Sequence, residues 1–177
     1  MRYLALLRGV NVGGSAAIRM ADLRDCAAGL GFEEVATYIA SGNLLFRSRE
    51  RSATRLESQL ETAIRDRFGF PVSVVVRSGA EVRRIVERIP AHWLDAAELR
   101  VTVAFLLRGA DGAAIARQLR PKDGIDELAV APGALLIATR RDALTRTGIR
   151  LIGTPPYKLL TARNLNTTLE LAELLGR

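Results

Sequence analysis

The spacing of apolar residues predicts alternating strands and helices in the first half of the chain. An unbroken apolar run indicates a buried strand, and apolar residues at i, i+3, i+4 and i+7 indicate one face of a helix. Ser41-Gly42-Asn43, between two short apolar runs, has the composition of a hairpin turn. The predicted elements are a strand at 3–8, a helix at 20–30, strands at 35–40 and 44–47, a helix at 53–68, a strand at 72–77 and a helix at 80–89 capped by Ser78.

The second half repeats this order more loosely. Its predicted elements are a strand at 101–107, a helix at 113–119, a hairpin across Pro132-Gly133 with a strand at 135–139, a short helix near 142–149, a strand near 159–162 and a helix at 165–175 capped by Asn164. Short sequences also recur in order: Leu6-Leu7-Arg8-Gly9 as Leu106-Leu107-Arg108-Gly109, and the stretch ending at Arg77-Ser78 as the one ending at Arg163-Asn164. A repeat of about 85 to 90 residues is domain-sized, so the sequence predicts two similar domains in tandem.

The predicted fold class is α+β: a tandem duplication of a ferredoxin-like βαββαβ unit, the α/β plait, with an extra helix after each copy. The first domain would span residues 1–95 and the second 96–177, with a connector at 90–98. Trp93 and His92 lie in this connector, where we expect them to pack or to lie on the surface. In this topology the loop after the first strand and the turn between the second and third strands share one end of the sheet. We therefore expect residues 9–15 beside Ser41-Gly42-Asn43.

Composition narrows the chemistry. Cys26 is the single cysteine and His92 the single histidine of 177 residues, which excludes a disulfide framework and a zinc site built from Cys and His. The apolar run at 3–7 is too short for a signal-peptide core, and no stretch reaches the length of a membrane span. We expect a cytoplasmic protein with no metal, no cofactor and no membrane contact, as a monomer or weak dimer.

The net charge of +7 raises the alternative of nucleic-acid binding. Only two of the 26 basic residues are lysine, and the chain is rich in alanine, which fits coding bias as readily as selection for phosphate contacts. The densest basic stretch runs from residue 140 to 163. The residues that would contact nucleic acid there are Arg140, Arg141, Arg146, Arg150 and Lys158. A solvated basic face is the simpler interpretation of this stretch.

Three loops carry candidate binding chemistry. Residues 9–14 follow a strand and precede a helix, a setting in which backbone N–H groups can bind an anion, although the sequence is neither GxGxxG nor a P-loop. The turn at 41–43 adds a hydroxyl and an amide to the same end of the sheet, but Ser41 has no histidine to activate it. Residues 161–167 concentrate polar groups at a strand-to-helix junction, where Asn164 can cap the helix and Arg163 can meet a carboxylate or phosphate.

Four motifs in order resemble one known family. They are Arg8-Gly9-Val10-Asn11-Val12-Gly13-Gly14, Met20-Ala21-Asp22-Leu23-Arg24, Thr37-Tyr38-Ile39-Ala40-Ser41-Gly42-Asn43 and Thr161-Ala162-Arg163-Asn164-Leu165-Asn166-Thr167, and together they look like the bacterial family called domain of unknown function 1697. The resemblance covers essentially the whole chain. It implies a cytoplasmic protein with two ferredoxin-like domains, without a particular activity, substrate or cofactor.

Carried over position by position, the resemblance marks ten candidate ligand-binding residues. They are Arg8, Asn11, Gly13, Gly14, Tyr38, Ser41, Gly42, Asn43, Arg163 and Asn164. The chain departs from the family pattern in two places. Ser15-Ala16-Ala17 stands where members often carry a basic or amide residue, and Ala40 stands where they carry an amide before the Ser-Gly-Asn turn.

These observations lead to one leading hypothesis and several alternatives. The leading hypothesis is a non-catalytic binding module whose loops at 9–14 and 41–43 hold a small anionic or phosphate-bearing ligand. Arg8 supplies charge if it points to the loop end, and Arg163 joins the site if the two domains bring it there. The first alternative is a nucleic-acid-binding protein using the basic stretch 140–163. The second is a hydrolase or transferase without metal that uses Ser41, Tyr38 or Arg163, for which no general base is evident. A structural or protein-interaction role also stays open.

Overall fold

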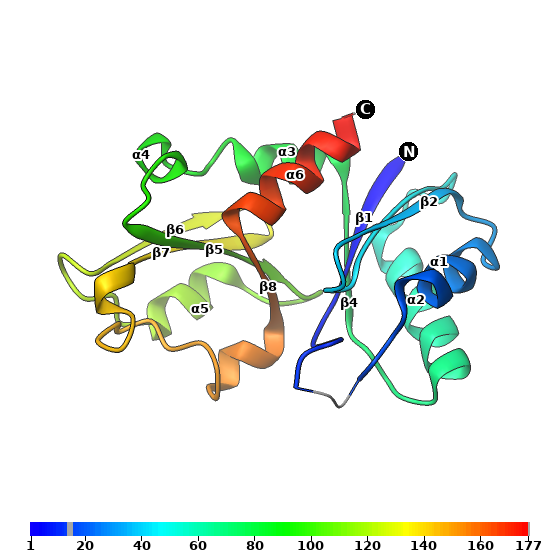
Figure 1. Cartoon of the computed structure of the whole chain (residues 1–177), viewed down its shortest axis with the longest axis horizontal. Coiled ribbons are helices and arrows are strands. Elements are labelled where there is room, and N and C mark those ends of the chain that lie inside the picture. Colours follow the sequence, from blue (N-terminus) through cyan, green and yellow to red (C-terminus); the bar gives the residue numbers. More distant parts are fainter. Residues whose placement is uncertain (14–15, 177) are drawn as a thin grey trace. The chain divides into compact units, whose positions relative to one another are not determined.

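The computed structural model describes residues 1–13 and 16–176. The described chain is a mixed α+β protein with two four-stranded antiparallel sheets and six α-helices, as predicted at this level (Figure 1). It forms two compact units, Met1–Val82 with Leu171–Arg177, and Arg83–Glu170. The domain boundary expected after residue 95 stays a prediction.

The first sheet has the strand order β2-β3-β1-β4. The elements of this half are β1 (Arg2–Leu7), α1 (Met20–Ala28), β2 (Glu33–Tyr38), β3 (Asn43–Arg47), α2 (Ala53–Phe68), β4 (Val74–Ser78) and α3 (Gly79–Val86). Figure 1 shows α1 and α2 on the same side of this sheet. The predicted strands and helices of the first half are all present, with ends that differ by a few residues.

Helix α2 shows why the sequence folds in this way. Ser52 caps its start by accepting a hydrogen bond from Arg55 N, and Gly69 ends it in the left-handed conformation at φ 80°. Its apolar residues recur on one face, and Leu56, Leu60 and Ile64 are each 0% exposed against the sheet core. Each such buried side chain stabilises the fold by about 2 kcal/mol.

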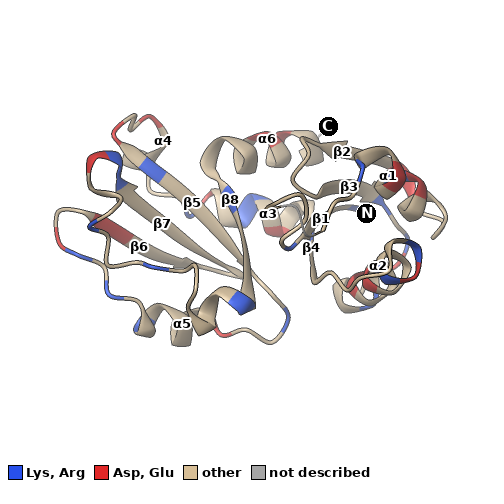
Figure 2. Ribbon diagram, turned by 60° about the horizontal axis from the view of Figure 1, so that its bottom comes forward, with Lys and Arg blue, Asp and Glu red and all other residues tan. Residues whose placement is uncertain are grey.

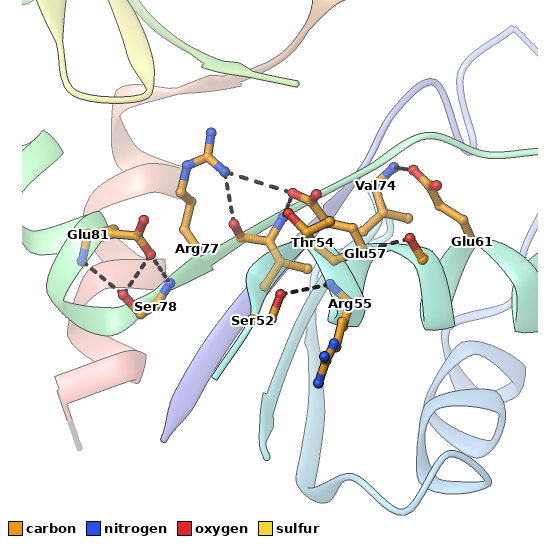
Figure 3. Close-up of polar contacts among 11 residues, drawn as sticks. Ser52, Thr54, Arg55, Glu57, Glu61, Val74, Arg77, Ser78 and Glu81 are labelled. Carbon is orange, nitrogen blue, oxygen red and sulfur yellow. Dashed lines mark hydrogen bonds and ion pairs between the residues drawn. The ribbon is translucent and has the colours of Figure 1, made fainter. Parts of the chain in front are cut away.

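Two glutamates of α2 also protect the edge of the first sheet. Glu61 Oε1 accepts a hydrogen bond from Val74 N at 2.9 Å, and Glu57 Oε1 accepts one from Val76 N at 3.0 Å (Figure 3). Both N–H groups belong to the edge strand β4 and point away from β1. Edge N–H groups left open invite pairing with another chain, so these carboxylates close the edge.

The second sheet has the equivalent order, β6-β7-β5-β8. The elements of this half are α4 (Ala91–Leu94), β5 (Leu99–Leu106), α5 (Gly112–Gln118), β6 (Asp126–Ala131), β7 (Ala134–Arg140), the 3₁₀ helices η1 (Arg141–Ala143) and η2 (Pro155–Leu159), β8 (Leu160–Asn164) and α6 (Leu165–Gly176). Figure 1 shows α5 along one side of this sheet.

The prediction of a helix near residues 142–149 is wrong. Only the short η1 lies there, and the rest of the connection between β7 and β8 is irregular apart from η2. The reason is that Asp126 accepts hydrogen bonds from the Thr147 hydroxyl at 2.6 Å and from Gly148 N at 2.8 Å. These bonds hold residues 147 and 148 in a turn, which a continuous helix would have to break.

The strand register corrects the alignment of the two Leu-Leu-Arg-Gly sequences by one residue. Leu7 N donates to Gly42 O at 2.8 Å, and the corresponding bond of the second sheet runs from Leu106 N to Gly133 O at 2.9 Å. Leu7 therefore matches Leu106, and Arg8 matches Leu107 instead of Arg108. A shift of one residue places every side chain of a strand on the other face of the sheet, so this correction decides which residues of the copies are comparable.

A helix follows the last strand of each sheet, as predicted. Ser78 and Glu81 form a reciprocal cap of α3: Ser78 N donates to Glu81 Oε2 at 2.8 Å, and Glu81 N donates to Ser78 Oγ at 3.3 Å (Figure 3). Asn164 caps α6 by accepting a hydrogen bond from Thr167 N at 2.8 Å. Both predicted caps are confirmed.

Candidate functional site

The two predicted ligand loops of the first unit do lie side by side. Asn11 Nδ2 donates to Ala40 O at 2.7 Å, and Leu7 N donates to Gly42 O. Gly42 has φ 72°, and a Cβ at this position would overlap the side chain of Val10. The turn can approach the loop this closely because residue 42 is glycine. The expectation drawn from the topology is confirmed for residues 9–13, and residues 14 and 15 lie outside the described residues.

The amide side chains of these loops bond to their own chain. Asn11 donates to Ile18 O at 3.0 Å as well as to Ala40 O, and accepts from Ile18 N at 2.9 Å. Asn43 is 0% exposed and donates to Tyr38 O and to Ser41 Oγ, each at 3.0 Å. Both amides therefore shape the paired loops.

The other predicted residues of the first unit surround the same end of the sheet. Arg8 and Tyr38 are half-buried, and Gly13 is exposed with φ 68°. Gly14 lies outside the described residues. Ile39 has φ 48°, an unfavourable conformation for a β-branched residue, and its side chain is 51% exposed. Their role in ligand binding stays a prediction.

Arg163 and its counterpart Arg77 are both largely buried. Arg77 Nη1 donates to Val76 O at 2.8 Å, and Arg163 Nη1 donates to Ala162 O at the same distance. Burial lowers the pKa of Arg163 to about 10. Burial also lowers the pKa of Arg77, although Glu81 and Glu57 oppose this shift (Figure 3). The same buried guanidinium has thus been kept at the same strand position in both sheets.

A polar hollow of about 470 Å³ lies in the second unit, and we call it the Arg141 hollow. It is formed by the α4 segment, the start of β5, the start of η1 and the junction of β8 with α6. Its lining residues are Trp93, Leu94, Asp95, Ala96, Ala97, Leu99, Arg100, Val101, Arg141, Asn164, Leu165 and Asn166. Of the predicted ligand residues that the structure describes, Asn164 lines this hollow and Arg163 does not.

The wall formed by the α4 segment is fixed by hydrogen bonds. Trp93 is 2% exposed, and its Nε1 donates to Glu127 Oε2 at 3.0 Å. His92 Nε2 lies 2.8 Å from the same oxygen, and the bonds from Trp93 and His92 lower the pKa of Glu127. Arg141 Nε donates to Ala97 O at 2.9 Å, which connects the wall to the start of η1. The hollow is therefore preformed.

The Arg141 hollow has a positive balance of charge. Arg100 and Arg141 line it, against the single lining carboxylate of Asp95. Neither arginine forms an ion pair within the described part of the chain, and Arg141 uses Nε on Ala97 while its two other guanidinium nitrogens stay available. The first turn of α6 lies at the same place, and the N–H groups of a first turn carry partial positive charge. The arrangement suits a small anion.

The basic residues proposed for nucleic-acid binding do not form one set. Arg140 makes a two-point ion pair with Asp142, at 3.0 and 2.7 Å, and Arg141 lines the hollow. Arg146, Arg150 and Lys158 are exposed on the connection between β7 and β8. Figure 2 shows the Lys and Arg residues of this unit scattered over strands, turns and helices. Nucleic-acid binding stays an untested alternative.

Neither a metal-binding cluster nor a membrane-spanning helix is found among the described residues. Within residues 1–13 and 16–176, His, Cys, Asp and Glu side chains do not gather in groups of three that would hold a metal ion. In the same residues, no helix combines the length and apolar content needed to cross a membrane.

Sequence reasoning missed three polar residues that line the hollow, Asp95, Arg100 and Asn166. Arg100 directly precedes the strand predicted at 101–107, and Asn166 lies in the helix predicted at 165–175. The signal that would have found Arg100 is the polar alternation Arg100, Thr102 at the start of β5.

Fold and site thus define a two-sheet α+β protein with a basic hollow. A family model described as "Protein of unknown function (DUF1697)" matches residues 1–135, so the chain belongs to this family, and the resemblance seen in the motifs is confirmed. The chain is similar to a solved structure described as that of the conserved bacterial protein SP0830 from Streptococcus pneumoniae. Identity is 30%, each chain is covered to 98%, and the TM-score is 0.86. No curated protein matches the chain.

Proposed function

We propose that this protein is a non-catalytic binding module for a small anionic or phosphate-bearing ligand, and that the Arg141 hollow is its binding site. The observation that carries the proposal is the presence of Arg100, Arg141 and the first turn of α6 around one preformed hollow. Guanidinium groups bind phosphate and carboxylate through paired hydrogen bonds, which are stronger than bonds between neutral groups.

The Arg141 hollow fits this function better than the paired loops of the first unit. The loop amides of Asn11 and Asn43 already bond within the chain, so they have little capacity left for a ligand. In the hollow, Arg141 uses Nε on Ala97 O, which leaves its other guanidinium N–H groups for a ligand. The proposed ligand is still an anion, as predicted from the sequence, but its proposed binding site now lies in the second unit instead of the first.

The lining of the hollow also favours binding over catalysis. Among the described lining residues, Asp95 is the one carboxylate, and none is Ser, Cys, His, Tyr or Lys. A hydrolase or transferase needs a nucleophile or base within reach of the substrate. The hollow offers charge and donors for holding an anion.

We also propose that both units are ferredoxin-like and that the protein is cytoplasmic. The strand orders β2-β3-β1-β4 and β6-β7-β5-β8 are what two ferredoxin-like plaits would have, with the second plait lacking the helix before its last strand. A cytoplasmic protein is proposed on the sequence grounds given above.

Calorimetric titration with pyrophosphate at low ionic strength tests the proposed function. We expect saturable binding, and we expect Arg100→Ala and Arg141→Ala each to raise the Kd about tenfold or more, because each loses a charge-assisted hydrogen bond worth about 1.5–3 kcal/mol. Arg117→Ala is the matched control: it removes an equal charge from an exposed position on α5, away from the hollow. Equal weakening by all three variants, or no binding by the folded protein, would contradict the proposal.

A further inference from the structure

The second unit has a groove at the place where α2 lies in the first unit. This groove, of about 570 Å³, is bordered by β5, β7 and β8 and by the irregular connection between β7 and β8. Its lining residues are Arg100, Thr102, Ile137, Thr139, Leu144, Thr145, Thr147, Ile149, Arg150, Leu151, Ile152, Tyr157 and Ala162. We call it the Ala162 groove.

The corrected register shows which residues of the two copies are comparable. Val76 matches Ala162 and Tyr3 matches Thr102, because Arg77 pairs with Leu4 as Arg163 pairs with Val103. Val76 is 0% exposed and Tyr3 is 2% exposed in the first unit. Of their counterparts, Ala162 is exposed and Thr102 is half-buried, and both residues line the groove. The groove is therefore the space that a missing helix leaves over the sheet.

The backbone of β8 offers a hydrogen-bond donor to this groove. In the first unit, Val76 N points away from β1 and donates to the carboxylate of Glu57 on α2, at 3.0 Å. Ala162 occupies the same position in β8, so its N–H points away from β5 in the same manner. No described residue of the second unit supplies a carboxylate to it. The first copy thus shows what this strand position binds when a carboxylate is present.

The lining of the groove combines apolar walls with positive charge. Leu144, Ile149, Leu151 and Tyr157 supply apolar surface from the connection. Arg100 and Arg150 line the groove, make no ion pair within the described residues, and none of the described lining residues is acidic. Such a lining takes a ligand with an apolar body and an anionic group.

The connection that walls the groove is held in place. Asp126 accepts from the hydroxyls of Thr139 at 2.9 Å and Thr147 at 2.6 Å, and from the backbone N–H of Lys122 at 3.0 Å and Gly148 at 2.8 Å. Lys122 Nζ also donates to Arg146 O at 2.6 Å. These bonds fix the position of residues 146–148 in the connection. The side of the groove that the connection forms is therefore in place without a ligand.

We propose that the Ala162 groove binds a small organic carboxylate with an apolar body, whose carboxylate accepts the Ala162 N–H bond in the way that Glu57 does in the first unit. Arg150 and Arg100 add charge, and the apolar body packs where the side chains of α2 would lie. Arg100 lines both this groove and the Arg141 hollow, whereas Arg150 and Ala162 line the groove alone. The proposal goes beyond the function proposed above.

Calorimetric titration with 2-naphthoate and with the neutral analogue 2-naphthamide tests the proposal. We expect 2-naphthoate to bind with a Kd below about 1 mM and 2-naphthamide to bind about tenfold more weakly or worse, because the amide lacks the charge. Ala162→Trp fills the groove and should abolish binding of both compounds. Arg150→Ala should weaken 2-naphthoate binding about fivefold or more and leave 2-naphthamide binding nearly unchanged.

Further variants distinguish the contribution of the Ala162 N–H from that of the arginine charge, and distinguish binding in the Ala162 groove from binding in the Arg141 hollow. Ala162→Pro removes the outward N–H of an edge strand, a position at which a sheet tolerates proline, and should weaken 2-naphthoate selectively. Arg141→Ala should leave 2-naphthoate binding unchanged, and Arg150→Ala should leave pyrophosphate binding unchanged. Circular dichroism verifies that each variant is folded. No binding by the wild type, or 2-naphthoate binding that survives Ala162→Trp in a folded protein, would overturn the proposal.

Discussion

Replacing Gly148 with alanine is expected to lower the free energy of unfolding of the second unit by about 3 kcal/mol. A Cβ at residue 148 would overlap the carbonyl oxygen of Arg120 and lie 2.9 Å from its carbonyl carbon. Both atoms belong to the backbone, so the clash cannot be relieved by a change of rotamer. The connection between β7 and β8 would have to move away from residue 120 and weaken its bonds to Asp126. Urea unfolding followed by circular dichroism measures the loss.

Gly29→Ala is the control for this substitution. Gly29 has φ −61°, and an added Cβ would make its nearest contacts at 3.4 and 3.5 Å, which are ordinary separations. Alanine is compatible with this conformation, so we expect a change of at most about 0.5 kcal/mol. A Gly148→Ala protein as stable as Gly29→Ala would show that the connection does not pack against residue 120 as described.

Replacing Asp126 with alanine is expected to cost about 3 kcal/mol at neutral pH, and replacing it with asparagine somewhat less. The carboxylate is 8% exposed and accepts four hydrogen bonds, which alanine would leave without an acceptor. Asparagine keeps the shape but loses the charge, and one of its two acceptor atoms becomes a donor.

The Asp126 contribution should also depend on pH in a defined direction. Burial alone would raise the pKa of Asp126, but the hydrogen bonds from Thr147, Lys122, Gly148 and Thr139 outweigh it and hold the pKa below the usual 3.8. The folded state therefore favours the ionised form. Its stabilisation is complete above the pKa of the unfolded chain, and it is lost as the pH falls through the lower pKa of the folded state.

Urea unfolding between pH 3 and 7 measures this dependence, within a range set by the ordinary carboxyl pKa of about 4. The difference in stability between wild type and Asp126→Asn should be constant near neutral pH and shrink in the most acidic samples. Asp123→Asn is the control, because Asp123 is exposed in the same turn and should change stability little. A difference that stays constant across the whole range would show that Asp126 is not the acceptor described here.

The sequence predicted the strands and helices well wherever one pattern dominated. The helical spacing of Leu56, Leu60 and Ile64, bounded by Ser52 and Gly69, identifies α2 with both ends. The pairing of residues 9–15 with the turn at 41–43 was also predicted from topology alone, and it holds for the described residues 9–13. Local propensity and short-range topology agree in these cases.

The sequence was misleading where long-range contacts decide the structure. The connection after β7 contains residues compatible with a helix, yet the Asp126 carboxylate from β6 holds it in turns. The one-residue error in aligning β1 with β5 arose because both faces of these strands are apolar, so side-chain pattern alone does not specify register.

The candidate site was predictable only in part for a related reason. Asn164 was predicted as a candidate ligand residue. The Arg141 hollow, however, is lined by residues from four separate segments of the chain, which no single motif reveals. Burial of the amide of Asn43, and the internal bonds of Asn11, depend on distances that no sequence motif reports. Polar residues in a motif identify a region, and the partners of each side chain decide whether a ligand can use it.

Amide chemical-shift mapping with pyrophosphate tests the central claim most directly, because it locates an anion on the chain without a substitution. We expect the amides that shift to belong to residues 93–101, to Arg141 and to residues 164–167, with a common dissociation constant. Shifts concentrated in residues 9–13 and 40–43 would contradict it and would place the anion at the paired loops of the first unit.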